Sequence, residues 1–257
     1  MLDFAIDLAH RAGALLRAAQ ERERSVEAKG PVDVVTDADR ASEALIVGAI
    51  RERFPEHAIV AEEGGAAAGD GRYQWLIDPL DGTMNYLHGL PIYSVSLALL
   101  HLGELQLGVV YDPSRGELFA AERGGGARCN GRALRVSAVA QLERALISTG
   151  FAYDRATRPD NNLAEHDRLL LRAQDVRRTG SAALDLCYVA AGRLDAHWEL
   201  GLKPWDTAAG ALIVREAGGQ VTDWAGRPWP VGEPRIVASN GRIHAALLHE
   251  LALARQP

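Results

Sequence analysis

Two aspartates three residues apart, Asp78 and Asp81, have the residue types and the spacing best suited to metal chemistry in this chain. They follow an apolar segment, and Pro79 and Gly82 argue against a helix, so we expect the pair in a loop that leaves a strand. Together with the Leu80 carbonyl, two carboxylates at this spacing can hold one divalent cation or bridge two. Asp-Pro and Asp-Gly also form ordinary turns, so this run alone fits either a metal site or a turn.

Acidic residues elsewhere in the chain favour the metal site. Glu62 and Glu63 follow a second apolar segment, where adjacent like charges are unfavourable unless a cation or solvent relieves them. Asp206 lies at the expected start of a helix, a position at which it could also serve as a helix cap. If Thr83 begins another helix, the free N–H groups of its first turn would face a bound phosphate, and Gly82 would let the backbone approach it.

Metal-dependent hydrolysis of a phosphate monoester is the chemistry that this set of residues predicts. The ester dianion repels hydroxide, so the reaction needs cations that neutralise it, lower the pKa of a bound water and stabilise the leaving alkoxide. Four carboxylates can balance about two divalent ions. Rival patterns are missing from the sequence: Ser148 and Ser181 lack a nucleophile elbow, no Walker loop occurs, and the histidines form no His-x-x-x-His zinc pair.

These separated motifs resemble the inositol monophosphatase family of magnesium-dependent, lithium-sensitive phosphatases. The resemblance extends over nearly the whole chain, and its most specific segments are residues 33–39, 62–63, 78–86, 205–210 and 214–219. It implies an α/β layered fold, the α-β-α-β-α sandwich of the sugar phosphatases that is shared with fructose-1,6-bisphosphatases. It also implies a homodimer.

The resemblance implies a set of ligands for two to three Mg²⁺ ions. Glu62, Asp78 and the Leu80 carbonyl would hold the first ion, while Asp78, Asp81 and Asp206 would hold the second. A third, weaker ion would depend on Glu62 through water. Lithium would inhibit by occupying the second position.

Matching positions further imply which residues act on the phosphate ester. The implied catalytic residues are Glu62, Asp81 and Thr83, with Thr83 orienting the nucleophilic water that Glu62 and the metals activate. The backbone N–H groups of Gly82 and Thr83 would cradle the phosphate. Asp81 and Asp206 would also border the bound substrate.

The identity of the ester depends on residues around this centre. Met84 favours the inositol branch of the family, because branches acting on 3′-phosphonucleotides or histidinol phosphate tend to have Lys at that position. Glu199 matches a family residue that binds sugar or inositol hydroxyls, and a carboxylate accepts hydrogen bonds from vicinal hydroxyls. Ser181 and the Ala182 backbone match another part of that pocket, and Lys29 could approach the metal-bound waters.

We therefore expect hydrolysis of inositol 1-phosphate, a small-molecule phosphate ester, with broad specificity. Fructose 1,6-bisphosphate, other sugar or glycerol phosphates, histidinol phosphate and 3′-phosphonucleotides are alternative substrates, and Glu199 could instead be a solvent-facing strand residue. An interaction protein that keeps the fold is the alternative from a different class. Loss of metal ligands would mark such a protein, yet all of them are present in this chain: Glu62, Asp78, Asp81, Thr83 and Asp206.

Composition is typical of a globular enzyme. The 257 residues include 28 Lys and Arg against 34 Asp and Glu, a net charge of −6, which argues against a nucleic-acid partner. The two cysteines, Cys129 and Cys187, give no disulfide framework. No apolar run reaches the roughly 18 residues that span a bilayer, and the N-terminus lacks the pattern of a secretory signal, so we expect no membrane interaction and a cytoplasmic location.

Hydrophobic periodicity and turn signals predict the elements that must position the site. The predicted helices cover residues 2–20, about 38–53 with Thr36 or Asp37 as N-cap, about 162–171, 181–191 and 206–217. The predicted strands cover residues 58–61, 75–77 and 145–148, with an antiparallel meander between 92 and 135 that includes a glycine turn at 124–126. We expect one catalytic domain, 1–257, with two subregions of about 1–140 and 141–257.

Overall fold

The computed structural model describes residues 1–20, 26–28, 34–64 and 66–255. The first part of the chain forms a two-stranded hairpin, a seven-stranded sheet and three helices. In chain order these elements are α1 (Leu2–Gln20), β1 (Val26–Ala28), β2 (Val34–Thr36), α2 (Asp37–Arg53), β3 (Ala58–Ala61), β4 (Tyr73–Asp81), α3 (Thr83–Leu87), β5 (Ser94–His101), β6 (Glu104–Asp112), β7 (Glu117–Glu122), β8 (Gly126–Cys129) and β9 (Arg132–Ala133).

The second part of the chain forms a five-stranded sheet, four α-helices and one short 3₁₀ helix. In chain order these elements are η1 (Leu142–Arg144), β10 (Leu146–Thr149), α4 (Leu163–Leu170), β11 (Asp175–Arg177), α5 (Ala182–Ala190), β12 (Ala196–Leu200), α6 (Pro204–Glu216), β13 (Gln220–Thr222), β14 (Arg235–Ser239) and α7 (His244–Ala254).

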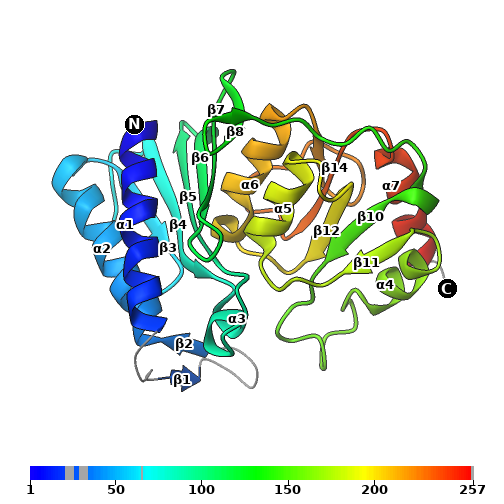
Figure 1. Cartoon of the computed structure of the whole chain (residues 1–257), viewed down its shortest axis with the longest axis horizontal. Coiled ribbons are helices and arrows are strands. Elements are labelled where there is room, and N and C mark those ends of the chain that lie inside the picture. Colours follow the sequence, from blue (N-terminus) through cyan, green and yellow to red (C-terminus); the bar gives the residue numbers. More distant parts are fainter. Residues whose placement is uncertain (21–25, 29–33, 65, 256–257) are drawn as a thin grey trace.

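Helices and sheets alternate in five layers across the molecule (Figure 1). Helices α1 and α2 cover one face of the first sheet, α5 and α6 lie between the two sheets, and α4 and α7 cover the outer face of the second sheet. Each sheet face that a helix layer covers is apolar, which is what holds such layers together. The predicted α-β-α-β-α sandwich is therefore confirmed.

The two sheets differ in how their strands pair. The first sheet has the order β3-β4-β5-β6-β7-β8-β9, and all its pairs are antiparallel except β3 with β4. The meander predicted between residues 92 and 135 corresponds to β5 through β9. The second sheet has the order β11-β10-β12-β14-β13, in which β10 pairs in parallel with both β11 and β12.

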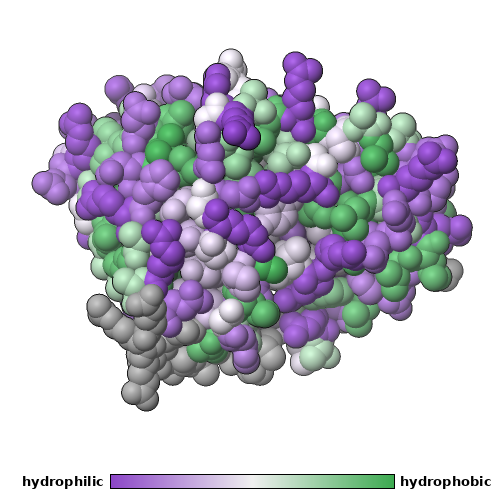
Figure 2. Space-filling view, in the orientation of Figure 1, coloured by the Kyte–Doolittle hydropathy of each residue, from purple (hydrophilic) through white to green (hydrophobic). Residues whose placement is uncertain are grey.

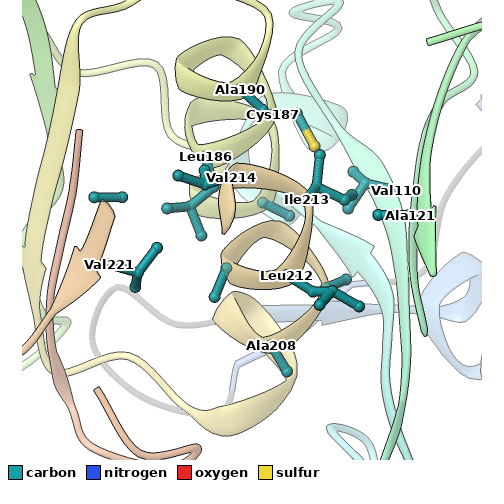
Figure 3. Close-up of a cluster of buried hydrophobic side chains, with 14 of the residues drawn as sticks. Val110, Ala121, Leu186, Cys187, Ala190, Ala208, Leu212, Ile213, Val214 and Val221 are labelled. Atoms are coloured by element: carbon teal, nitrogen blue, oxygen red, sulfur yellow. The ribbon is translucent and has the colours of Figure 1, made fainter. Parts of the chain in front are cut away.

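The middle helix layer carries the largest apolar surface. Its helices are buried on nearly all sides, so that Leu186 of α5 and Ile213 of α6 are both fully buried. Figure 3 shows these side chains between Val110 and Ala121 of the first sheet and Val221 of the second. Packing of this middle layer against both sheets fixes the two halves of the chain relative to each other.

Two boundaries beside the site differ from the sequence prediction. Residues 78–81 were expected in a loop, but they form the end of β4, where the pairing with β5 shifts register between Asp78 and Asp81. Pro79 fits there because β3 pairs with β4 only as far as Ile77, so no neighbour needs the missing N–H. Helix α6 begins at Pro204, two residues earlier than predicted, and proline is well suited to a first helical turn.

The ends of α2 and α6 are held by specific polar contacts. Thr36 caps α2 and exchanges hydrogen bonds with Asp39, a capping box, which confirms one of the two predicted N-caps. At the C-terminal end of α6, the Glu216 carboxylate accepts hydrogen bonds from the backbone N–H groups of Gly124 and Gly126, both at 2.9 Å. The predicted glycine turn between β7 and β8 is therefore hydrogen-bonded to the C-terminal residue of α6.

The outer surface is mixed in character. Figure 2 shows hydrophilic and hydrophobic residues interspersed over the visible face. Across the part of the chain that the structure describes, none of the helices combines the length and the apolar composition that a bilayer crossing requires.

Candidate active site

A pocket of about 300 Å³ opens where the two sheets and the middle helices meet. Its walls come from the end of β4, the start of α3, the starts of α5 and α6, and β12. Every residue predicted to act in the site borders it: Glu62, Asp78, Leu80, Asp81, Gly82, Thr83, Ser181, Ala182, Glu199 and Asp206. The structure thus gathers residues that lie up to 144 positions apart in the chain (206 − 62).

Asp81 is held by three hydrogen-bond donors. Its Oδ2 accepts hydrogen bonds from the Ser181 hydroxyl, from the Ser94 hydroxyl at 3.2 Å and from the Ala183 N–H at 3.1 Å. All three bonds engage Oδ2, so Oδ1 has no partner among the described residues. The carboxylate is fixed in place while one oxygen stays available to a ligand.

Asp78 and Asp206 follow the same pattern. Asp78 Oδ1 accepts a hydrogen bond from the Leu80 N–H at 3.0 Å, and Asp206 Oδ2 accepts one from the Lys203 N–H at 2.7 Å. The N-cap of α6 is Lys203, so the interpretation of Asp206 as the N-cap is wrong; as the third residue of the helix, Asp206 accepts the Lys203 N–H with only one of its two oxygens. Within the described part of the chain, the second oxygen of each carboxylate is not engaged.

Mutual repulsion marks these carboxylates as a set. Burial raises the pKa of Asp78 well above its ordinary value, and the nearby charges of Glu62, Asp81 and Asp206 raise it further. Burial also raises the pKa of Asp206 well above its ordinary value, and Glu62 and Asp81 contribute in the same direction. Burial raises the pKa of Asp81 to about 6, although its three hydrogen bonds oppose the change. A nearby cation would relieve this repulsion.

The donor set suits a hard divalent cation. Carboxylate oxygens and a backbone carbonyl are the ligands that Mg²⁺ and Ca²⁺ prefer. Among the described residues, no three His, Cys, Asp or Glu side chains converge closely enough to form a finished metal site. Binding of a cation would therefore require movements that bring these side chains closer together.

Thr83 is oriented by two acceptors. Its hydroxyl lies 3.1 Å from Asp39 Oδ1 and 3.0 Å from the Leu80 carbonyl, so its single proton is directed to one of them. A lone pair on the oxygen can then accept a hydrogen bond from a water in the pocket. Asp39 was not predicted as a site residue, although the capping box Thr36-x-x-Asp39 was visible in the sequence.

Gly82 brings the backbone to the edge of the pocket. It has φ +89°, in the left-handed region, and a Cβ at this position would lie 2.9 Å from the Ile92 carbonyl oxygen. Any other residue would be strained by both effects. Thr83 begins α3, as the sequence suggested, so the N–H groups of this first turn have no partners within the helix.

Ser181 and Ala182 lie at the start of α5. Ser181 caps the helix by accepting a hydrogen bond from the Leu184 N–H at 3.3 Å, and it donates its own proton to Asp81. Its hydroxyl therefore supports a carboxylate of the site. Both residues border the pocket, and the Ala182 N–H belongs to the first turn of the helix.

Glu199 belongs to β12 and is buried, with 9% of its surface exposed. The interpretation of Glu199 as a solvent-facing strand residue is therefore wrong. Two further buried residues, His197 and Asp185, surround it, and neither was singled out in the sequence. Burial raises the pKa of Asp185 to about 7, while the His197 charge and the Thr179 hydroxyl oppose this. Burial alone would lower the pKa of His197, but Glu199 and Asp185 outweigh it and the pKa is raised.

Comparison with known proteins identifies this arrangement. A model of the inositol monophosphatase family matches residues 1–256. The chain belongs to the inositol monophosphatase family. The family's inositol-1-monophosphatase from Synechocystis sp. is 46% identical over 257 residues, which cover 99% of this chain and 90% of that protein. The Nus factor SuhB of Pseudomonas aeruginosa is 48% identical over 255 residues, which cover 96% of this chain and 94% of its own.

A solved structure of the inositol monophosphatase family agrees at the level of the fold. The inositol monophosphatase from Anabaena (Nostoc) sp. PCC 7120 matches with a TM-score of 0.90 at 46% identity, and the match covers 98% of this chain and 95% of that one. Family membership supports a phosphatase. The match covers nearly the whole chain, so the likeness in fold includes the elements that line the pocket.

The sequence analysis also considered Lys29 and the histidines. Lys29 lies outside the described residues. Of the eight histidines, five are not buried, as expected, but His57, His197 and His244 are buried. His57 stacks on aromatic rings, and His244 lies between Thr222 and Ser239 at 2.8 Å from each. Of these three buried histidines, only His197 contacts a residue that lines the pocket, Glu199.

Proposed function

We propose that this member of the inositol monophosphatase family is a Mg²⁺-dependent phosphomonoesterase that hydrolyses inositol 1-phosphate to inositol and phosphate. The observation that carries the proposal is the set of three aspartates in one pocket, of which Asp78 and Asp81 are buried and Asp206 is half-buried. Each has one oxygen held by the protein and a second oxygen without a partner among the described residues. Such a set is unfavourable on its own and becomes favourable when cations balance it.

The predicted ligand assignment for two to three ions fits the donors in the pocket. Glu62, Asp78 and the Leu80 carbonyl would hold one ion, and Asp78, Asp81 and Asp206 would hold another. The hydrogen bonds that fix Oδ2 of Asp81 and Asp206 leave Oδ1 of each for the ion. When bound, the ions would supply charge neutralisation of the ester and a lowered pKa for an attacking water.

The chain's own residues would orient the reactants. Thr83, whose proton is directed toward Asp39 or Leu80, would accept a hydrogen bond from the attacking water and set its direction. Glu62 would take the proton that this water loses. The N–H groups of Gly82 and Thr83 at the start of α3 would hold the phosphate oxygens, because they have no partners within the helix.

Glu199 supports a polyol as the leaving group. Its buried carboxylate borders the same pocket as the metal ligands, and it can accept hydrogen bonds from two vicinal hydroxyls. Inositol has hydroxyls on every carbon beside the ester, so it suits this acceptor. Other sugar phosphates, fructose 1,6-bisphosphate, histidinol phosphate and 3′-phosphonucleotides are the competing substrates of the same proposal.

A second candidate function comes from the names of the relatives. Several of them, at similar identity to the cyanobacterial phosphatase, are called Nus factor SuhB. A binding role of this chain beside its enzymatic role would accommodate both names. The set of carboxylates in the pocket favours catalysis, since a purely binding protein has no need to keep mutually repelling buried charges.

We also retain two predictions about the state of the protein. A homodimer is supported by large exposed apolar side chains near the α3 and α4 regions, among them Leu90, Leu163 and Leu171. A cytoplasmic location is supported by Cys129 and Cys187, which are both free thiols. Light scattering of the purified protein would test the dimer.

A phosphate-release assay tests the proposed function. The purified chain is incubated with inositol 1-phosphate, fructose 1,6-bisphosphate, histidinol phosphate and a 3′-phosphonucleotide, each with Mg²⁺ and with EDTA. We expect Mg²⁺-dependent release and the highest kcat/KM for inositol 1-phosphate. Release that persists in EDTA would refute the metal assignment, and a much higher kcat/KM for another ester would refute the substrate assignment.

A further inference from the structure

His197 lies directly behind the proposed polyol-binding carboxylate. It precedes Glu199 by two residues on β12, so the two side chains project from the same face of the sheet. The imidazole Nε2 is 3.4 Å from Glu199 Oε2. The His197 side chain is fully buried and does not border the pocket, so it can touch Glu199 but not the substrate.

The other edge of the imidazole is anchored. Nδ1 is 3.0 Å from the Ser148 hydroxyl and 3.7 Å from Asp185 Oδ2, and Asp185 is itself held by the Thr179 hydroxyl at 2.8 Å. These contacts come from a neighbouring strand, β10, and from α5. The ring therefore has a defined orientation that directs Nε2 toward Glu199.

Nε2 has no aligned hydrogen bond in this arrangement. It is one of two buried side-chain atoms in the described part of the chain that lack a hydrogen-bond partner. A buried polar nitrogen without a partner is costly, so Nε2 favours any small movement that aligns it with the carboxylate 3.4 Å away. The one ring nitrogen of His197 that lacks a hydrogen bond therefore faces Glu199.

Gly150 restricts the carboxylate from another side. The position that a Cβ of residue 150 would occupy is 2.1 Å from Glu199 Oε1 and 2.5 Å from Oε2. The Glu199 carboxylate therefore fills the space that the missing side chain leaves. Any residue larger than glycine at position 150 would displace it.

Electrostatic repulsion explains why Glu199 needs such support. Burial is the main cause of the raised pKa values of Asp81, Asp185 and Asp206, and the Glu199 charge adds to each in the same direction. The same repulsion tends to turn the Glu199 carboxylate away from the pocket. A donor at the back of the carboxylate opposes that tendency.

We propose that His197 is a positioning residue that holds the Glu199 carboxylate, over Gly150, in the orientation that accepts hydrogen bonds from substrate hydroxyls. The proposal rests on the proposed function, because it concerns selection of a polyol ester in that site. Hydroxyls of the leaving group would meet a fixed acceptor, and an ester without hydroxyls would not use it. His197 thereby contributes to substrate choice without touching the substrate.

Two substitutions of His197 distinguish the contribution of the Nε2–H donor from that of the rest of the imidazole ring. His197→Gln keeps an N–H donor near the position of Nε2, whereas His197→Asn keeps only the group nearest Nδ1 and Ser148. We expect His197→Asn to raise the KM for inositol 1-phosphate by about tenfold, the effect of one hydrogen bond to a charged group. The kcat should change by less than about twofold, because ground-state binding is what the donor supports.

Phenyl phosphate and a second mutation supply the specificity controls. The KM for phenyl phosphate, which has no hydroxyls, should stay the same in both variants, and His197→Gln should resemble the wild type with either ester. In a Glu199→Gln background, His197→Asn should have no further effect on the KM for inositol 1-phosphate. The matched control is His244→Asn, another buried histidine whose loss should leave both KM values unchanged.

Crystal structures give a readout that does not require activity on inositol phosphates. The Glu199 carboxylate should remain over Gly150 in the wild type and in His197→Gln, and should leave that place in His197→Asn. An unmoved carboxylate in His197→Asn, or an equal rise of KM for both esters, would overturn the positioning role. Failure of the proposed function is distinct, because it appears as a wild-type protein without Mg²⁺-dependent turnover of inositol 1-phosphate.

Discussion

Replacing Asp81 by asparagine would remove a buried charge that destabilises the metal-free protein and, at the same time, a ligand that the proposed Mg²⁺-dependent reaction needs. In the folded protein without metal, burial raises the pKa of Asp81 to about 6 from the ordinary 3.8. At pH values above 6, the difference between these two values corresponds to a loss of about 3 kcal/mol of folding free energy. Asparagine carries no charge, so this loss disappears in the variant.

The substitution also has a cost, which follows from the contacts of Asp81. The amide oxygen of the variant can still accept hydrogen bonds from Ser94, Ser181 and the Ala183 N–H. Its NH₂ group then faces the other carboxylates and the pocket, at a cost of about 1 kcal/mol for imperfect pairing. We expect Asp81→Asn to stabilise the metal-free protein by about 2 kcal/mol at pH values near 8.

The sign of the pH dependence is fixed by the raised pKa. Between about pH 3.8 and pH 6 the folded protein binds more protons than the unfolded chain, so wild-type stability falls as the pH rises through this window. The advantage of Asp81→Asn should therefore be complete above about pH 6 and should shrink toward zero near pH 4. Removing the Asp81 charge also lowers the pKa values of Asp78 and Asp206, which adds to the stabilisation of the variant above about pH 6.

Urea unfolding in EDTA, followed by circular dichroism, measures this difference. An Asp81→Asn variant that is less stable than the wild type at about pH 8, or whose advantage grows in acid, would refute the reasoning. The same variant should lose roughly a thousandfold in Mg²⁺-dependent kcat, because one metal ligand contributes several kcal/mol. Added Mg²⁺ should stabilise the wild type more than the variant.

Three further predictions concern the same pocket. Asp206→Asn should lower the Mg²⁺-dependent kcat by roughly a thousandfold while the circular dichroism spectrum stays the same, and an unchanged rate would contradict its role as a ligand. Gly82→Ala should lower the free energy of unfolding in urea by about 2 kcal/mol, because alanine meets both the left-handed φ and the Ile92 carbonyl; a neutral effect would show that the turn can relax. Li⁺ should inhibit phosphate release at fixed Mg²⁺, whereas K⁺ at equal ionic strength should not, and equal effects of both ions would contradict a lithium-sensitive second position.

Local signals in the sequence predicted the individual helices and strands, and the resemblance to the family implied their arrangement in layers. The capping residue Thr36 and the helical periodicity after it predicted α2, and the alternation of apolar runs with Gly and Asp-Pro turns predicted the meander. The run from Asp78 to Asp81 was misjudged for a structural reason. Proline usually ends a strand, but here the partner strand ends first, so β4 continues past Pro79 with a register shift.

The sequence did not reveal those residues that support the site by contacting another site residue. The chemistry of Asp78 and Asp81 could be inferred from their types and spacing, as could that of Glu62. Asp39, by contrast, gains its role from contact with Thr83, 44 positions along the chain. Asp39 lies in the segment 33–39 that carries the family resemblance, but no sequence spacing showed that its carboxylate would reach Thr83.

The surroundings of Glu199 show the same limit. His197 and Glu199 share a strand face, a relation that strand periodicity alone could have predicted. The contribution of Asp185 depends on how α5 packs across β12, and that of Gly150 depends on the close approach of a side chain from another strand. Such contacts are fixed by tertiary packing, which no local pattern in a single sequence encodes.

Helix α6 is held at both ends by other elements: the Glu216 carboxylate accepts hydrogen bonds from the glycine turn, and the Trp205 carbonyl accepts one from the Ser96 hydroxyl at 3.2 Å. Its first turn presents Asp206 to the pocket, and its last residue is held by the N–H groups of Gly124 and Gly126. A helix of 13 residues is about 20 Å long and resists stretching. The position of its C-terminal end therefore fixes how far Asp206 projects into the pocket. The hairpin between β7 and β8 lies away from the pocket, yet it helps to fix how far the Asp206 carboxylate projects into the pocket.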